Sequence, residues 1–171
     1  MARLSSSTHT TPLRTETDTF DPSHGVIVFT DGSASVKNRT GGWAWIALDS
    51  GDGRIDERGG EEDTTIGRME LTAVVMALES LAEMEGVEDV LVVSDSAYVV
   101  DGFNDKTRAR NKNGDLWGYL ETAAATFRVI EFEHIHGHQK GVEGYWNNCA
   151  DKAAVAARKV IVDSQVQPKK G

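Results

Sequence analysis

The sequence predicts an α/β domain built on a five-stranded mixed sheet flanked by helices. Residues 26–30, 41–49 and 54–64 have the composition of three consecutive strands joined by short turns, as in an antiparallel meander. Helix-like and strand-like segments then alternate, which requires crossover connections between parallel strands. Because such crossovers are right-handed, we expect the strand at 90–93 to lie beside and parallel to the strand at 26–30.

The clearest helix is predicted at residues 68–85. Its apolar residues, among them Leu71, Val74 and Leu78, recur at helical spacing, and acidic residues occupy the opposite face. Gly86 follows and suits the C-cap of such a helix.

The remaining segments complete the pattern. The uninterrupted apolar run at 90–93 predicts a strand that is covered on both faces. After it we expect a helix at 96–103, a helix at 115–126, a strand at 128–136 and an alanine-rich helix at 145–159.

One folded unit is expected over residues 25–160. Residues 1–24 are polar and rich in serine and threonine, which predicts a disordered N-terminal extension. Residues 161–171 are also polar, and we expect a flexible C-terminal tail. The sequence contains no internal repeats.

The composition suits a globular protein of 171 residues with a net charge of −9 and a pI near 5.0. This charge argues against a protein that coats nucleic acid electrostatically, although it permits an enzyme that gathers carboxylates around cations. The sequence shows neither an apolar run of the roughly 20 residues that span a bilayer nor a secretory signal. Cys149 is the only cysteine, so we expect a reducing compartment and a cytoplasmic location.

Two apolar strands run directly into aspartates. Asp31 lies in "VIVFTDGSAS" and Asp95 lies in "VLVVSDSAYVV". If the strands are parallel neighbours, both carboxylates lie at the carboxyl edge of the sheet, where α/β sheets bind ligands. Neighbouring carboxylates repel each other unless one is protonated or a cation lies between them. Divalent ions with oxygen ligands satisfy that requirement.

Two further acids lie in helices that pack on the sheet. Glu70 occurs in "GRMELTAVVMAL", in the first turn of the long helix, and Asp151 occurs in "NNCADKAAVAAR". Taken singly, each acid has an ordinary explanation: Glu70 complements the helix dipole, Asp151 is a surface acid and Asp31 belongs to an Asx turn. The combination of all four favours a shared site.

The motifs occur in the order and spacing of a known family. The sequence contains "FTDGS" at 29–33, "GGWAW" at 41–45, "RMEL" at 68–71, "SDSAYV" at 94–99, "DLW" at 115–117 and "HGH…N…AD" at 136–151. Over residues 25–159 the chain resembles type 1 ribonuclease H, the enzymes that cut the RNA strand of an RNA–DNA hybrid. The resemblance implies a ribonuclease H-like fold, with residues 25–160 as the catalytic domain.

The resemblance also implies the site and its chemistry. It assigns Asp31, Glu70, Asp95 and Asp151 as ligands of two Mg²⁺ ions, with Mn²⁺ as a possible substitute, and His138 as the catalytic histidine of a mobile loop. Two-metal hydrolysis would leave 5′-phosphate and 3′-hydroxyl ends. The implied partner is an RNA–DNA hybrid bound by a monomer, without a membrane.

Hybrid-contacting residues are also implied: Gly32, Ser33, Lys37, Asn38, Thr65 and Asn147. The chain departs from the family pattern near them. Ile66 and Gly67 stand where family members often have asparagines, and Ala97 stands where they often have glutamine. Lys37 likewise replaces a common asparagine. These departures predict weaker or altered recognition of the duplex.

Two clusters allow more than one interpretation. His134, His136 and His138 alternate and would share one face of a strand, where they could bind zinc; otherwise His134 is an ordinary cross-strand residue and His138 lies beyond the strand end. The loop at 106–112 holds four basic residues, which are either a solvated face or a contact with a nucleic-acid backbone.

Three classes of function remain open from sequence. The first is the hybrid-specific endoribonuclease. The second is another nuclease or an integrase-like enzyme of the same wider fold, since these also cluster acids. The third is a catalytically weak module that binds hybrids, which the presence of all four acids and His138 disfavours.

Overall fold

The structure, a computed structural model, describes residues 5–6 and 20–166. Its centre is the predicted five-stranded mixed sheet, with strand order β4-β3-β2-β6-β7. Strands β2, β3 and β4 form the antiparallel meander, and β6 and β7 add to β2 as parallel strands. The strands are β2 (Gly25–Ser35), β3 (Thr40–Asp49), β4 (Arg54–Glu62), β6 (Asp89–Ser94) and β7 (Val129–His134).

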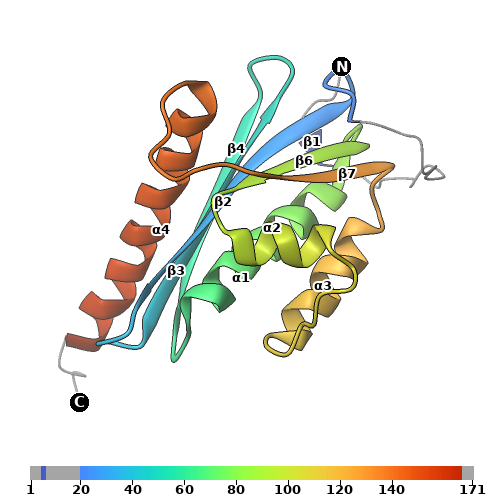
Figure 1. Ribbon diagram of the computed structural model, residues 1–171. Helices are drawn as coiled ribbons and strands as arrows, with labels where there is room; N and C mark the ends of the chain where they lie inside the picture. Colours follow the sequence, from blue (N-terminus) through green and yellow to red (C-terminus); the bar gives the residue numbers. More distant parts are fainter. Residues whose placement is uncertain (1–4, 7–19, 167–171) are drawn as a thin grey trace.

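Helices cover both faces of this sheet (Figure 1). Alternate residues of each strand point to opposite faces, so Val28 and Val92 pack in the larger core with α1, α2 and α3, whereas Phe29 and Val93 pack in a smaller core with α4. The covered strand β6 agrees with the apolar run in the sequence. The helices are α1 (Ile66–Ala82), α2 (Ala97–Asn104), α3 (Gly114–Ala124) and α4 (Val142–Val166).

Helix α1 begins and ends earlier than predicted. Thr65 is its N-cap and its hydroxyl accepts a hydrogen bond from the Arg68 N–H at 3.3 Å, so Glu70 lies in the second turn and not in the first. The helix ends at Ala82, and Gly86, with a φ of 78°, belongs to the following turn and is not the C-cap. A short strand β5 (Met84–Glu85) fills the gap and pairs with β1 (Ser5–Ser6), neither of which was predicted.

Strand β2 is longer than predicted. It continues through Asp31 to Ser35 because β3 pairs with it along its full length, down to the Ser35–Thr40 pair. Asp31 therefore lies inside its own strand and not at the turn that ends it. The parallel neighbour β6 does end here, since Ser94 is opposite Thr30. Asp31 thus lies at the carboxyl edge of β6, although it is buried.

The ends of the domain extend into the predicted extensions. Within the predicted N-terminal extension, the Asp21 N–H donates to Asp89 at 2.9 Å. The carboxylate of Asp89, which is fully buried, also accepts from Arg128, directly before β7. Helix α4 continues to Val166, into the predicted tail. The rest of both predicted extensions, 1–4, 7–19 and 167–171, lies outside the described residues.

Helix α4 packs backbone to backbone against β3 at Gly42. A Cβ atom at this position would lie 2.1 Å from the carbonyl oxygen of Ala154 and 2.5 Å from the backbone nitrogen of Arg158. The missing side chain sets the distance between α4 and the sheet. This distance matters because α4 carries Asp151.

We expect Gly42→Ala to lower the free energy of unfolding by about 1–3 kcal/mol, because the methyl group forces α4 off the sheet. Urea denaturation measures the change. Gly118→Ala is the matched control: the site is in α3 with no atom within 4 Å of a new Cβ, so the variant should gain about 0.4–1 kcal/mol. Equal stability of Gly42→Ala and the wild type would contradict the close packing.

Candidate active site

Asp31 is the central residue of the candidate site. Its side chain shares the face of β2 that packs toward α4, and it is 7% exposed. The N–H of Gly32 donates to its Oδ1 at 2.8 Å. Asp95 directly follows the end of β6, one residue beyond the Thr30–Ser94 pair, so the two aspartates meet at the predicted edge.

Glu70 reaches this edge from α1. The close approach depends on Gly32, because a Cβ there would lie 2.5 Å from the backbone nitrogen of Glu70. The hydroxyl of Ser96 donates to Glu70 Oε2 at 2.5 Å. Ser96 is also the N-cap of α2, so one residue joins the start of α2 to a carboxylate carried by α1.

Asp95 is contacted by residues of α4 and β7. The side-chain amide of Asn147, in α4, donates to Asp95 Oδ2 at 3.2 Å, and Asn147 is only 1% exposed. The Nε2 of His134 lies 3.1 Å from the backbone oxygen of Asp95. Asn147, predicted from the resemblance to contact the substrate, therefore contacts a carboxylate of the cluster.

The carboxylates influence one another electrostatically. Burial, followed by repulsion from Asp95, Asp151 and Glu70, raises the pKa of Asp31 to about 8, although the Gly32 N–H opposes this. Burial also raises the pKa of Glu70, assisted by Asp95 and opposed by the hydrogen bond from Ser96. The four predicted acids, from β2, α1, the β6–α2 turn and α4, are therefore in one electrostatic cluster.

Known proteins are similar to this chain in sequence. The family model for RNase H matches residues 23–159. The chain belongs to the ribonuclease H family. It is 37% identical over 147 residues to a ribonuclease H of Jannaschia sp., covering 77% of this chain and 89% of the relative. It is 38% identical over 156 residues to a ribonuclease H of Rhodospirillum rubrum, covering 82% and 89%.

Solved ribonuclease H structures have the same fold. The N-terminal RNase H domain of a Mycobacterium tuberculosis protein, solved as a maltose-binding-protein fusion, superposes with a TM-score of 0.70 at 19% identity, over 83% of this chain and 99% of that one. RNase H1 of Halobacterium salinarum gives 0.63 at 21% identity, over 79% and 98%. As a ribonuclease H family member, the chain is a hydrolase that acts on RNA–DNA hybrids.

The ribonuclease H family generally uses a divalent metal, and the donor chemistry of the cluster suits one. Among the described residues, no group of three His, Cys, Asp or Glu side chains forms a ready-made metal site in this conformation. The donors are nevertheless all carboxylates, and they destabilise the ionised form of a buried neighbour, Asp31. A hard divalent cation would relieve that repulsion.

The histidines divide between a strand and a loop. His134 ends β7, whereas His136 and His138 follow it, and the rings of His134 and His136 meet edge to face at 5.5 Å. The three histidines form no metal site among the residues described here. His138 is exposed and has a φ of 61°, a left-handed conformation that is rare for a residue with a side chain.

The other predicted contact residues lie in two places: two are close in sequence to acids of the cluster, and two are in the β2–β3 hairpin. Ser33 is partly exposed on β2 near Asp31, and Thr65 is exposed at the start of α1. Lys37 and Asn38 are exposed in the β2–β3 hairpin, where the Asn38 N–H donates to Ser35.

Sequence reasoning did not predict the contact of Ser96 with Glu70 or that of His134 with Asp95. Ser96 carried a usable signal, because a serine directly after Asp95 and before a helix is a typical N-cap. The contact of His134 with Asp95 depends on strand register and had no such signal. Separately, no helix among the described residues is long and apolar enough to span a membrane.

Without divalent metal, Asp31→Asn should stabilise the protein increasingly as the pH rises from about 5 to about 8. Native Asp31 retains its proton up to about pH 8, whereas the unfolded side chain releases it near 4, so ionisation between these values costs the wild type stability. Each unit of pKa shift corresponds to about 1.4 kcal/mol, so the gain at pH 8 should reach several kcal/mol.

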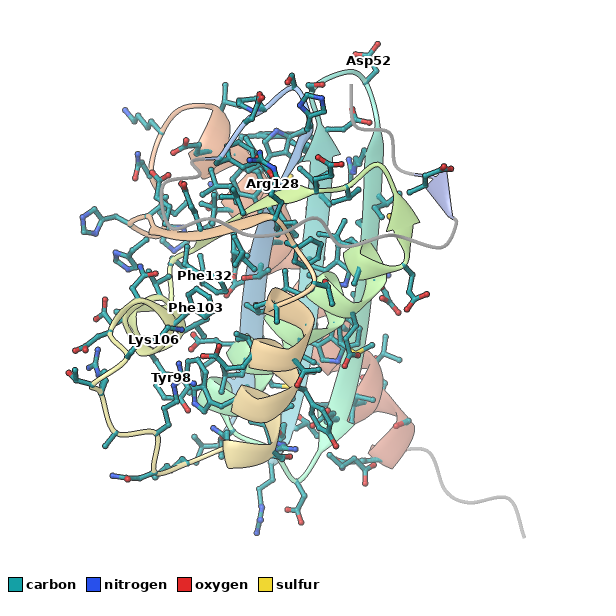
Figure 2. All side chains as sticks on the ribbon, turned by 90° about the vertical axis from the view of Figure 1, so that its right-hand side faces the viewer. Asp52, Tyr98, Phe103, Lys106, Arg128 and Phe132 are labelled. Atoms are coloured by element: carbon teal, nitrogen blue, oxygen red, sulfur yellow. The ribbon has the colours of Figure 1, made fainter. Side chains whose placement is uncertain are left out.

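Urea denaturation in EDTA at several pH values measures this effect. Asp52→Asn is the control, because Asp52 is exposed at the tip of the β3–β4 turn (Figure 2) and should leave the pH dependence unchanged. A constant difference between Asp31→Asn and the wild type across the pH range would show that Asp31 is not held in a repulsive cluster.

Proposed function

We propose that this protein is an endoribonuclease that hydrolyses the RNA strand of RNA–DNA hybrids with two divalent cations, leaving 5′-phosphate and 3′-hydroxyl ends. The single observation that carries the proposal is the buried cluster of four carboxylates, in which burial and then repulsion from the other three acids raise the pKa of Asp31 to about 8. Burying a carboxyl group that favours its protonated form so strongly lowers the stability of the folded protein near neutral pH. Such groups are typical of functional sites.

Asp31, Glu70, Asp95 and Asp151 would hold the cations, with Mg²⁺ the expected metal and Mn²⁺ a substitute. When bound, the cations would activate water and stabilise charge that develops on the scissile phosphate. Asp31 is the residue on which the charges of Asp95, Asp151 and Glu70 all act, so it would be the central donor to the cations.

Neighbouring side chains would keep the carboxylates in place. Ser96 restrains Glu70 by its hydrogen bond, and Asn147 restrains Asp95. His138 would move protons or assist the release of product, because its imidazole is exposed on the loop that follows β7 and can both donate and accept a hydrogen bond.

The substrate surface would combine few polar side chains with exposed backbone. Gly32 and Ser33 follow Asp31 in β2, Thr65 is exposed at the start of α1, and Lys37 and Asn38 would extend the surface along the β2–β3 hairpin. RNA is distinguished from DNA through contacts with 2′-hydroxyl groups across a minor groove.

The departures from the family pattern fall on the same surface. Ile66 is 50% exposed and Ala97 is also exposed, so neither position offers a polar side chain to a duplex. We therefore expect altered duplex recognition. A monomeric state and a cytoplasmic location complete the proposal as predictions.

Incubation of the purified protein with Mg²⁺ and labelled RNA–DNA hybrid, double-stranded RNA, DNA duplex and branched junction tests this function. We expect cleavage of the RNA strand of the hybrid alone. Asp31→Asn should bind the hybrid and fail to cut it, with at least about a 10³-fold loss of rate because it removes the central ligand of the cluster. Asp52→Asn should cut as the wild type does.

Each alternative predicts a different result in the same assay. Cleavage of the junction or the DNA duplex would indicate another nuclease of the wider fold. Binding of the hybrid without cleavage by the wild type would indicate a hybrid-binding module. Either result would overturn the proposed function.

A further inference from the structure

The loop between α2 and α3 contains a dense group of basic residues with two possible roles. Lys106, Arg108, Arg110 and Lys112 occur within residues 105–113 of a protein that acts on a polyanion. A phosphate contact would require these cations to be available. Their partners in the structure therefore decide between a binding surface and a structural role.

Three of the four cations are already paired with carboxylates of the flanking helices. Arg108 Nη1 lies 3.0 Å from Asp101 Oδ2 in α2. Lys106 Nζ and Arg110 Nη2 lie 3.2 and 2.8 Å from the same oxygen of Glu121 in α3.

The paired cations lower the pKa of Glu121. Burial would raise the pKa of Glu121, but hydrogen bonds from Arg110 and Lys106 outweigh burial and lower it. Lys112, by contrast, is exposed and makes no ion pair with any residue that the structure describes.

Arg110 joins the end of α2 to α3. Its Nε and Nη2 donate to the backbone oxygen of Gly102 at 3.1 and 2.8 Å, and its guanidinium lies 4.3 Å from the ring centre of Trp117. The side chain is 23% exposed. A planar fork of donors that also stacks on an aromatic ring is specific to arginine.

A second set of contacts joins α2 to β7. The Lys106 ammonium lies 4.0 Å from the ring centre of Phe103, which stacks on Phe132 at 4.0 Å and 19°. Figure 2 shows Lys106, Phe103 and Phe132 in succession. The side-chain amide of Asn104 donates to the Phe132 backbone oxygen at 3.1 Å.

Helix α2 packs on the sheet far less extensively than α1 or α4 does, although Val99, Val100 and Phe103 are buried in the core. Its first turn is part of the site, through the hydrogen bond from Ser96 to Glu70. Near that turn, Tyr98 meets the Trp117 ring edge to face and accepts a hydrogen bond from Asn113, the last residue of the loop.

We propose that residues 105–113, here named the α2 clasp, hold α2 so that Ser96 keeps Glu70 in place, and that Lys106, Arg108 and Arg110 are positioning residues and not phosphate contacts. The activity part of this proposal rests on the proposed function, whereas its structural part does not. Any phosphate that approached these cations would have to displace a carboxylate from each of them.

Arg110→Lys is the decisive variant, because it keeps the charge and loses the fork. We expect both Arg110→Lys and Arg110→Gln to lower the Tm by about 3–6 °C, whereas the control Lys112→Gln in the same loop should shift it by less than about 1 °C. Hydrogen exchange of the α2 amides should accelerate in both Arg110 variants. Unchanged Tm and exchange in Arg110→Lys would overturn the clasp.

Hybrid assays distinguish positioning from phosphate contact. The clasp predicts that Arg110→Lys lowers kcat about threefold to tenfold with KM unchanged, and that the salt dependence of hybrid binding stays the same in Arg110→Gln. A phosphate contact would instead reduce the slope of log Kd against log salt by about 0.7–0.9 in Arg110→Gln, and Arg110→Lys would restore it.

A double mutant tests the connection to Glu70. In a Ser96→Ala background, Arg110→Lys should cause no further loss of kcat, because both changes act on the same hydrogen bond. Fully additive losses would contradict that connection. If the Arg110 variants do not fold, Lys106→Gln provides the milder test, with the same predicted direction in Tm and in α2 exchange.

The two proposals fail in different ways. A wild type that leaves hybrids intact would refute the proposed function, while Tm and hydrogen exchange would still test the clasp. A wild type that cuts hybrids, with an Arg110→Lys variant identical to it, would refute the clasp alone.

Discussion

Repulsion among Asp31, Glu70, Asp95 and Asp151 is the constraint on which the arrangement of the domain depends. Burial removes the water that would otherwise screen these charges, so the ionised form of Asp31 is strongly disfavoured. A fold selected for stability alone would separate these acids or replace one of them. The domain instead brings them together from four parts of the chain. A bound cation would explain this arrangement, because it would offset the repulsion.

Several features resist this repulsion by fixing backbone positions. Gly32 allows α1 to approach β2, and Gly42 allows α4 to approach β3, so two acid-bearing helices are set by backbone contact. Ser96 and Asn147 then restrain individual carboxylates by hydrogen bonds. In our proposal the α2 clasp also contributes, because ion pairs at the surface hold α2, and the first turn of α2 restrains Glu70.

The sequence predicted the sheet, its crossovers and the proximity of the four acids, because these depend on apolar periodicity and on motif spacing. It failed where a partner strand or helix decides the outcome. The length of β2 beyond Thr30 follows from pairing with β3, which local composition does not encode. The contact of Asn147 could not be predicted for the same reason, because only the packing of α4 shows that Asn147 is buried against Asp95. The charges at 106–112 left a solvated face and a contact with a nucleic-acid backbone both open, because their carboxylate partners lie in other elements.

Calorimetric titration of Mg²⁺ into the metal-free protein tests the central claim most directly. At pH 7, performed in two buffers of different ionisation enthalpy, it reports the protons released on binding. Because the pKa of Asp31 is about 8, the account predicts release of about one proton by the wild type and essentially none by Asp31→Asn. Binding without proton release, or equal release by both proteins, would contradict a cluster that holds a proton where the cation binds.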